Sequence, residues 1–146
     1  MATDLTLRAD YYQIQLLDER SVTDLGDFWT EEAAAEGIVT ADDALAIITS
    51  TNLRVGVSVD VLQREPSAPD ANAGHVVEGN LRVPSGRVVV MGCTDYLPDA
   101  ARVEVGPGWH RVRAVRFGTD EAAGEESAIH ERLRLSIWPV ERNGEN

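Results

Sequence analysis

Lysine is absent from this sequence of 146 residues, and potential metal ligands other than carboxylates are scarce. The single cysteine, Cys93, cannot form an internal disulfide, which favours a reducing compartment. The three histidines, His75, His110 and His130, are too far apart in the sequence to match the short ligand spacing of a zinc site. We therefore expect no bound metal and no cofactor. We interpret Cys93 as a small buried residue, and His110 and His130 as strand-face or core residues.

Long apolar runs and the common catalytic motifs are missing as well. No window approaches the roughly 18 apolar residues that cross a bilayer, and the first ten residues, MATDLTLRAD, lack the apolar core of a signal peptide. This predicts a cytoplasmic protein. The G-x-S-x-G, Walker A, G-x-G-x-x-G and H-E-x-x-H patterns are also absent, so no catalytic residue can be named and a non-enzymatic protein is favoured.

Acidic residues dominate the charge. There are 25 Asp and Glu against 13 basic residues, all of them Arg, which gives a net charge of -12 and a pI near 4.5. Such a field repels nucleic acid and anionic membranes and favours a basic protein partner, although the charge could also serve solubility alone. Arginine as the only basic residue, with abundant Ala, Gly and Val, is typical of high-GC bacterial genomes.

Alternating apolar residues predict a chain made mostly of β-strands. In residues 53–61, Leu53 and four valines alternate with other residues, as in a strand with one buried face. Residues 44–49 fit a strand or a helix, and we favour a strand. About eight strands are expected, at residues 11–17, 44–49, 53–61, 75–83, 87–93, 102–105, 109–117 and 130–140.

One short helix is expected near residues 30–37. Thr30 is a suitable N-cap, Glu31 and Glu32 fall in the first turn, where the helix dipole favours anions, and Gly37 can end the helix. With the strands, this predicts a single all-β domain over residues 1–146, an antiparallel β-sandwich.

Turns and loops suggest how the strands connect. The turn at residues 84–86 would join strands 75–83 and 87–93 into a hairpin, and the alternation shifts phase near Val115 and Phe117, which suggests a bulge. Residues 63–74 and 118–128 are expected to form exposed loops.

Aromatic residues beside acids are the best candidates for a binding surface, because aromatic anchors concentrate binding energy. The candidate partner-binding residues are Trp29, Glu31, Glu32, Asp42, Asp43, Asp95, Tyr96 and Asp99. Trp29 could equally staple the helix to the sheet. Trp109 and Trp138 fall within strands and are interpreted as core or sheet-face residues.

The order of motifs in the N-terminal third resembles the competence protein J family, inhibitors of a bacterial DNA-entry nuclease. The matching features are Tyr11-Tyr12-Gln13 at a strand, Trp29-Thr30-Glu31-Glu32-Ala33, Gly37 and Asp42-Asp43-Ala44. The resemblance extends over residues 9–62. It implies a non-enzymatic inhibitor of a basic nuclease, and an immunity protein against another toxin would show the same features.

Two other classes of function stay open. Asp95, Asp99, Asp120 and Glu121 could belong to a calcium- or carbohydrate-binding β-sandwich module. Carboxylate pairs such as Asp42 and Asp43 could also serve an unrecognised enzyme, for example one that hydrolyses glycosides.

Overall fold

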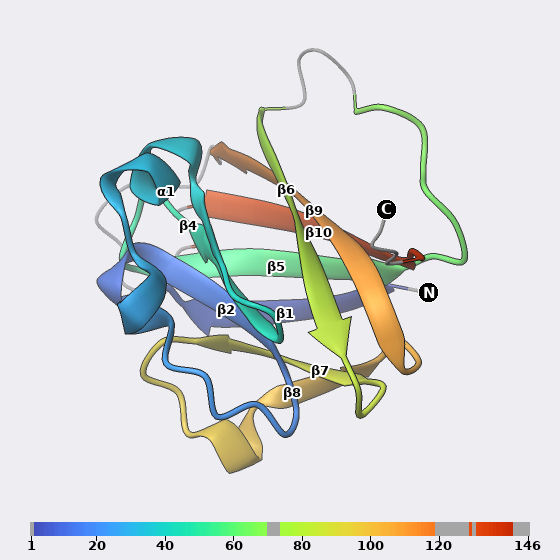
Figure 1. The fold of residues 1–146 in the computed structure, drawn as a ribbon. Helices are drawn as coiled ribbons and strands as arrows, with labels where there is room; N and C mark the ends of the chain where they lie inside the picture. The colour runs from blue at the N-terminus through green and yellow to red at the C-terminus, as the bar shows by residue number, and fades with distance from the viewer. Residues whose placement is uncertain (1, 70–73, 119–128, 130, 142–146) are drawn as a thin grey trace.

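Two five-stranded sheets pack face to face in the computed structural model, which describes residues 2–69, 74–118, 129 and 131–141 (Figure 1). In order across sheet A, the strands are β1 (Ala2–Arg8), β5 (Arg54–Val61), β10 (Glu131–Pro139), β9 (Gly108–Gly118) and β6 (His75–Val83). In order across sheet B, they are β3 (Ile38–Thr40), β4 (Ala44–Ile48), β2 (Gln13–Asp18), β7 (Arg87–Gly92) and β8 (Ala101–Glu104). The expected all-β sandwich is confirmed, with ten strands in the described ranges.

The main core lies between the two sheets. Each strand directs alternate side chains inward, as its period of two requires. Sheet A contributes Val55, Val57, Val59, Leu81, Val83, Val112, Ala114, Leu133, Leu135 and Ile137. Sheet B contributes Ile14, Leu16, Ile38, Leu45, Ile47, Val88, Val90 and Val103. The alternation seen in residues 53–61 is therefore the pattern of a strand buried on one face only.

Sheet B also has an apolar outer face, and this face is covered by short helices. The side of the sheet that faces away from the main core carries Leu17, Val39, Ala44, Ala46, Val89 and Met91, all of them buried. Against them pack Leu25 of η2 (Leu25–Phe28), Ala33 of α1 (Glu31–Glu36) and Leu97 of η3 (Leu97–Asp99), together with Trp29. Burial on both faces explains why residues 44–48 are continuously apolar and fit a helix pattern as well as a strand.

The helix α1 is stabilised at both ends by the residues that predicted it. The Thr30 side chain accepts a hydrogen bond from the Ala33 amide at 3.0 Å. Gly37 follows with a φ of 98°, a left-handed conformation that favours glycine, and its amide donates to the Ala33 carbonyl at 2.9 Å. The helix expected near residues 30–37 is confirmed.

The sheets are not purely antiparallel, because β10 runs parallel to β5 in the centre of sheet A. The pairing extends from Glu131 beside Val55 to Ile137 beside Val61. All other strand pairs in the described ranges are antiparallel. Strands β1 and β3 were not expected, the first because its apolar residues are few and the second because it is only three residues long.

The hairpin expected from β6 and β7 is wrong, since the two strands belong to different sheets. The chain crosses the sandwich at the turn between them, because both strands have apolar residues that must face the same core. The crossing is held by Asp18, whose Oδ1 accepts from the Ser85 amide at 2.9 Å and from the Ser85 hydroxyl at 2.7 Å.

The bulge expected near Val115 and Phe117 is also wrong. Strand β9 pairs residue for residue with β6 and with β10 along its length. The apolar phase shifts because the outer face of β9 is itself covered: Val115 is 7% exposed, and the Arg134 guanidinium lies over the Phe117 ring at 5.9 Å. Residue His130 lies outside the described residues.

A buried ion pair joins the two sheets at one end. Glu131, 2% exposed in sheet A, accepts from the Ser50 amide just after β4 at 2.9 Å and pairs with Arg116 Nε at 3.2 Å. Arg116 also donates to the Ile48 carbonyl of sheet B at 2.6 Å. The two side chains thus satisfy backbone groups of the opposite sheet.

We predict that Glu131→Ala lowers the free energy of unfolding by about 3 kcal/mol, because it leaves Arg116 and a backbone amide without their buried acceptor. Urea unfolding with an unchanged m-value measures this. The control is Glu104→Ala, whose side chain is 79% exposed and should change stability by less than about 0.5 kcal/mol. If both variants lower the free energy of unfolding equally, the ion pair between Glu131 and Arg116 does not stabilise the packing of the two sheets.

Candidate functional site

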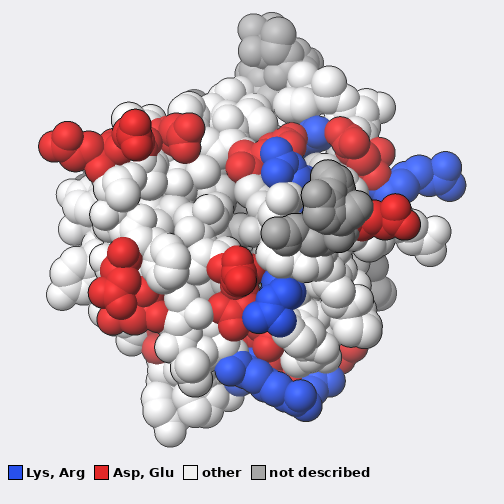
Figure 2. Space-filling view, in the orientation of Figure 1, with Lys and Arg blue, Asp and Glu red and all other residues white. Residues whose placement is uncertain are grey.

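The covering layer of sheet B carries a group of exposed carboxylates. From residue 21 to residue 53 the sequence contains seven acids and no arginine. Five of the acids lie on η2, at its N-cap or on α1, and we call them the acidic cover: Asp24, Asp27, Glu31, Glu32 and Glu36. All five are exposed, and none forms an ion pair with an arginine of the described residues. Figure 2 shows carboxylates without arginines over this part of the molecule, whereas the other half of the view mixes both.

Trp29 positions the acidic cover on the sheet. It lies between η2 and α1, is half-buried, and packs against the apolar outer face of sheet B. Glu31 and Glu32 follow in the first turn of α1 and point into solvent. Trp29 therefore serves as the staple that the sequence allowed, with part of its surface still accessible.

Asp42 and Asp43, in the turn between β3 and β4, have different environments. Asp43 Oδ1 accepts hydrogen bonds from the Ser21 hydroxyl at 3.0 Å and the Thr23 hydroxyl at 2.7 Å. It thereby fixes the segment that leads into η2. Asp42 is exposed, and its backbone carbonyl accepts a hydrogen bond from the Arg82 amide at 2.8 Å. The Asp43 side chain thus builds the fold, whereas that of Asp42 lies in solvent.

The other predicted residues lie in the connection between β7 and β8. Asp95 Oδ2 accepts from the Gly92 amide at 2.8 Å, so it closes a turn. Tyr96 is 69% exposed, and Asp99 is exposed on η3. Arg102 holds this connection by donating to the carbonyls of Leu97 and Ala100, at 3.0 and 2.7 Å.

Cys93, in the connection between β7 and β8, lies in a negatively charged environment. Burial raises the pKa of the Cys93 thiol, and the negative charges of Asp10 and Asp24 raise it further. The thiol is therefore protonated at neutral pH, which does not suit a nucleophile. It is half-buried, less enclosed than the sequence predicted.

Two exposed tyrosines were missed as site residues. The strand expected from Tyr11 begins only at Gln13, and Asp10–Tyr12 form the short helical turn η1. Tyr11 and Tyr12 are 73% and 49% exposed, and both have left-handed backbones, with φ of 59° and 61°. Such a conformation costs a bulky residue of order 1 kcal/mol. No residue pattern in the sequence signals this conformation.

The outer face of sheet A is rich in arginine. On it lie Arg54, Arg82, Arg111, Arg113, Arg132 and Arg134. Arg113, with a side chain 8% exposed, stacks over Trp138 at 5.2 Å and donates to Glu78 at 2.6 Å. Trp138 is thus a sheet-face residue, covered by this stack. Arg113 also donates to the Ser67 carbonyl at 2.8 Å, which ties residues 63–69 to the sheet.

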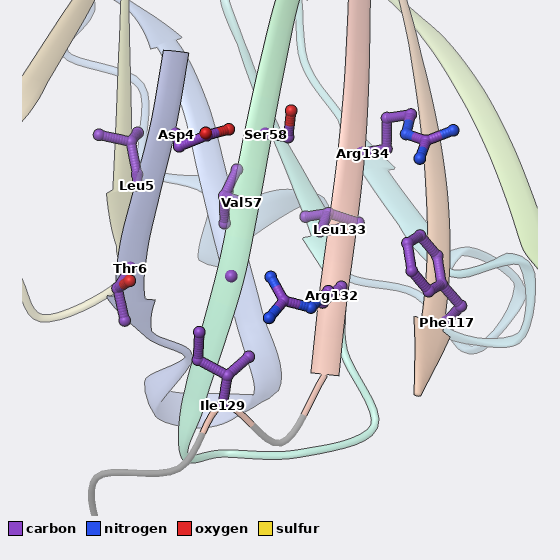
Figure 3. A pocket seen from close by; sticks show the side chains of 11 residues that line it. Asp4, Leu5, Thr6, Val57, Ser58, Phe117, Ile129, Arg132, Leu133 and Arg134 are labelled. Atoms are coloured by element: carbon purple, nitrogen blue, oxygen red, sulfur yellow. The ribbon is translucent and has the colours of Figure 1, made fainter. Parts of the chain in front are cut away.

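A cavity of about 330 Å³ lies on the same face, across β1, β5 and β10 (Figure 3). Asp4, Ser58 and Arg134 line it, and Arg132 extends toward β5. A Cβ at Gly56 would stand 3.0 Å from the Arg132 guanidinium, so the glycine leaves room for that side chain. The cavity has charges of both signs, which does not favour one class of ligand.

Within the described residues, no group of three His, Cys, Asp or Glu side chains could hold a metal ion. Asp120 and Glu121, which were considered for calcium with Asp95 and Asp99, lie outside the described residues. His110 is 1% exposed, and its two ring nitrogens face the carbonyls of Gly108 and Val105 at 3.0 and 2.9 Å, as befits a core residue. In the same described ranges, no helix has the length and apolar character needed to cross a membrane.

The fold resembles two solved structures. ComJ from Bacillus subtilis, the inhibitor of the DNA-degrading activity of NucA, superimposes with a TM-score of 0.72 at 15% identity, over 94% of this chain and 96% of that one. The product of crocagin biosynthetic gene J gives a TM-score of 0.58 at 14% identity, over 97% and 98% of the chains. No protein-family model and no curated protein matches the sequence. The likeness to ComJ extends through both sheets, so its restriction to the N-terminal third was wrong.

The ion pairs on sheet A predict how stability depends on pH. Burial raises the pKa of the Glu78 carboxyl, but hydrogen bonds from Arg113 and Arg111 outweigh this and bring it below 4.5. Glu78 therefore contributes stability that is complete above pH 4.5 and is lost as the pH falls through the lower pKa of the folded state.

We predict that Glu78→Gln lowers Tm at pH 7, and that the difference from wild type shrinks at about pH 3. Thermal unfolding at both pH values measures this. Glu36→Gln, at an exposed acid of the acidic cover, is the control and should show little difference at either pH. If the Tm difference between Glu78→Gln and wild type stays the same at both pH values, the ionised Glu78 carboxylate is not the source of this stability.

Proposed function

We propose that the protein is a non-enzymatic inhibitor that binds a basic nuclease or toxin through the covering layer of sheet B. The observation that carries this is the acidic cover: five exposed carboxylates on η2, at its N-cap or on α1, with no arginine among them. The proposal assigns the contact to Trp29, Glu31, Glu32 and Asp42 on one side of the layer. Tyr96 and Asp99 extend it on the other side, with Asp43 and Asp95 holding the backbone beneath.

The charge gives a physical reason for inhibition. Duplex DNA carries one negative charge for about every 1.7 Å of its length, so a nuclease needs a cationic cleft to hold it. A rigid surface with a dense row of carboxylates competes for the same cleft. It also attracts the nuclease over a distance, which speeds association. The net charge of -12 makes direct binding of the DNA itself unfavourable.

The fold supports the same proposal independently of charge. ComJ, which has this fold over nearly its whole length, is an inhibitor of a DNA-degrading nuclease. At 15% identity the likeness does not fix the partner, so the nuclease of this protein need not be of the NucA type.

The test is capture followed by inhibition. The purified protein is immobilised, an extract of the native host is passed over it, and bound proteins are assayed for DNA degradation with and without added wild-type protein. We expect a basic nuclease or toxin whose activity falls as the protein is added. Failure to retain such a protein, together with no effect on a nuclease encoded beside this gene, would exclude the proposal.

We predict that Glu31→Arg with Glu32→Arg slows association with the captured partner about tenfold at low salt, because surface charge acts mainly on encounter. Stability should fall by about 1 kcal/mol, since the first turn of α1 loses its favourable acids. Stopped-flow association at two salt concentrations and urea unfolding measure the two effects.

The matched control is Asp4→Arg with Asp60→Arg, which changes the net charge equally but on the outer face of sheet A. It should slow association much less. If both pairs slow association to the same extent, net charge alone matters and the acidic cover is not the contact.

A further inference from the structure

Three exposed tyrosines lie on two segments that touch each other. Tyr11 and Tyr12 of η1 line a hollow with Thr94 of the β7–β8 connection, and Tyr96 follows two residues later in that connection. Tyr11, Tyr12 and Tyr96 are 73%, 49% and 69% exposed. The Thr94 hydroxyl donates a hydrogen bond to Asp10, which ties the two segments together. Tyrosine is enriched among the residues that dominate binding energy at protein interfaces. A group of exposed tyrosines on two connected segments is therefore a candidate anchor for a partner.

The backbone of η1 is held by its neighbours on both sides. The Tyr12 amide donates to the Ala9 carbonyl at 2.9 Å, and the Tyr12 carbonyl accepts from the Thr49 amide at 3.0 Å. A Cβ at Gly92 would stand 2.2 Å from the Arg8 carbonyl oxygen, so only glycine allows β7 to approach the end of β1 this closely. Tyr11 and Tyr12 are thus presented on a backbone that is already held in place, so little order is lost there when a partner binds.

Folding alone does not account for tyrosine in η1. The left-handed backbone at Tyr11 is one that glycine adopts without strain, and the Tyr11 ring is mostly in solvent. A strained, exposed aromatic residue lowers stability without filling the core. Strain of this kind is concentrated at binding and catalytic sites.

The surroundings of the tyrosines are negative. Asp10 belongs to the same turn as Tyr11, and Asp99 follows Tyr96 on η3. Asp24 of the acidic cover is close enough to act on Cys93, in the same connection as Tyr96. Aromatic faces beside carboxylates attract guanidinium groups, which can stack on a ring and pair with an acid at once. The molecule uses this combination itself, where Arg113 lies over Trp138 and donates to Glu78.

We propose that Tyr11, Tyr12 and Tyr96 anchor the interface, and that the occupant is a protein surface presenting arginine side chains. This deepens the proposed function and rests on it: the acidic cover attracts the basic partner, and the tyrosines hold it. These three tyrosines, which we call the tyrosine patch, therefore affect mainly the dissociation rate of the complex. Glu31 and Glu32 affect mainly its association rate.

The first experiment locates the binding of a defined probe. A peptide of alternating arginine and glycine is titrated into the ¹⁵N-labelled protein, and amide chemical shifts are followed. We expect the largest changes in residues 10–12 and 94–99. The affinity of Tyr96→Ala for the arginine peptide should be about threefold lower than that of wild type. Wild-type protein should bind a matching lysine peptide more weakly than the arginine peptide. Changes confined to α1, or spread evenly over the surface, would overturn the assignment.

The second experiment separates a binding role from a structural one. Tyr11→Gly should leave Tm unchanged or higher, because the strain is relieved, yet it should weaken inhibition of the captured nuclease about tenfold or more through faster dissociation. Tyr11→Phe keeps the ring and should inhibit like wild type. Phe28→Ala removes a ring that is 44% exposed beside α1 and should change inhibition less than Tyr11→Gly.

The outcomes distinguish the two proposals. If the tyrosine variants inhibit as well as wild type, the patch is not the anchor, while the inhibitor function stands. If wild-type protein inhibits no nuclease, the inhibitor function fails, and the peptide titration still decides whether the patch receives arginine. A Tyr11→Gly variant with a lower Tm would show that the residue supports the fold, and it would overturn the argument from strain.

Discussion

The apolar outer face of sheet B is the constraint on which the rest of this structure depends. A sheet in a two-layer sandwich needs only one apolar face, but β2, β4 and β7 have apolar residues on both. The second face must be covered, and three short helices with Trp29 cover it. These segments are too short to be stable alone, so the sheet determines where they lie. Their outer sides then become the surface on which the acids are displayed.

The distribution of charge follows from this layering. Five acids lie together on the covering layer without an arginine between them, whereas the outer face of sheet A carries six arginines. Three of these, Arg111, Arg113 and Arg134, pair with Glu78 or stack on aromatic rings. Within the described residues, the acids of the acidic cover therefore form a group that no arginine interrupts (Figure 2). Such a group of like charges orients an approaching basic protein as well as attracting it. The exposed tyrosines lie at the margin of the same layer, where a partner attracted by the acids would meet them.

Much of the fold could be predicted from local pattern, because one-sided burial leaves a period of two. The strand at residues 54–61 was predicted on that basis, whereas the helix was predicted from its capping residues Thr30 and Gly37. Two-sided burial removes the period, which left residues 44–48 ambiguous. The covered outer face at Val115 and Phe117 made β9 resemble a bulged strand. Local pattern does not show that β6 and β7 belong to different sheets, or that β10 pairs in parallel with β5, because both depend on contacts between residues distant in the sequence. The candidate acids were visible as residues, but their roles depend on hydrogen bonds such as those of Asp43, and the strained tyrosines depend on backbone geometry alone.

The parallel pairing of β5 with β10 affects the order in which the two sheets form during folding. Residues 62–130 separate the two strands, so a long loop must close before sheet A gains its central strand, and contacts of such separation form slowly. Sheet B and its cover need only residues up to Glu104, and during synthesis they can assemble on a ribosome that has not yet released the end of the chain. In that interval β5 and β9 are open edges with unpaired backbone groups, vulnerable to pairing with other nascent chains. Strand β10 therefore closes sheet A by covering both edges, and a chain without it would be prone to aggregate.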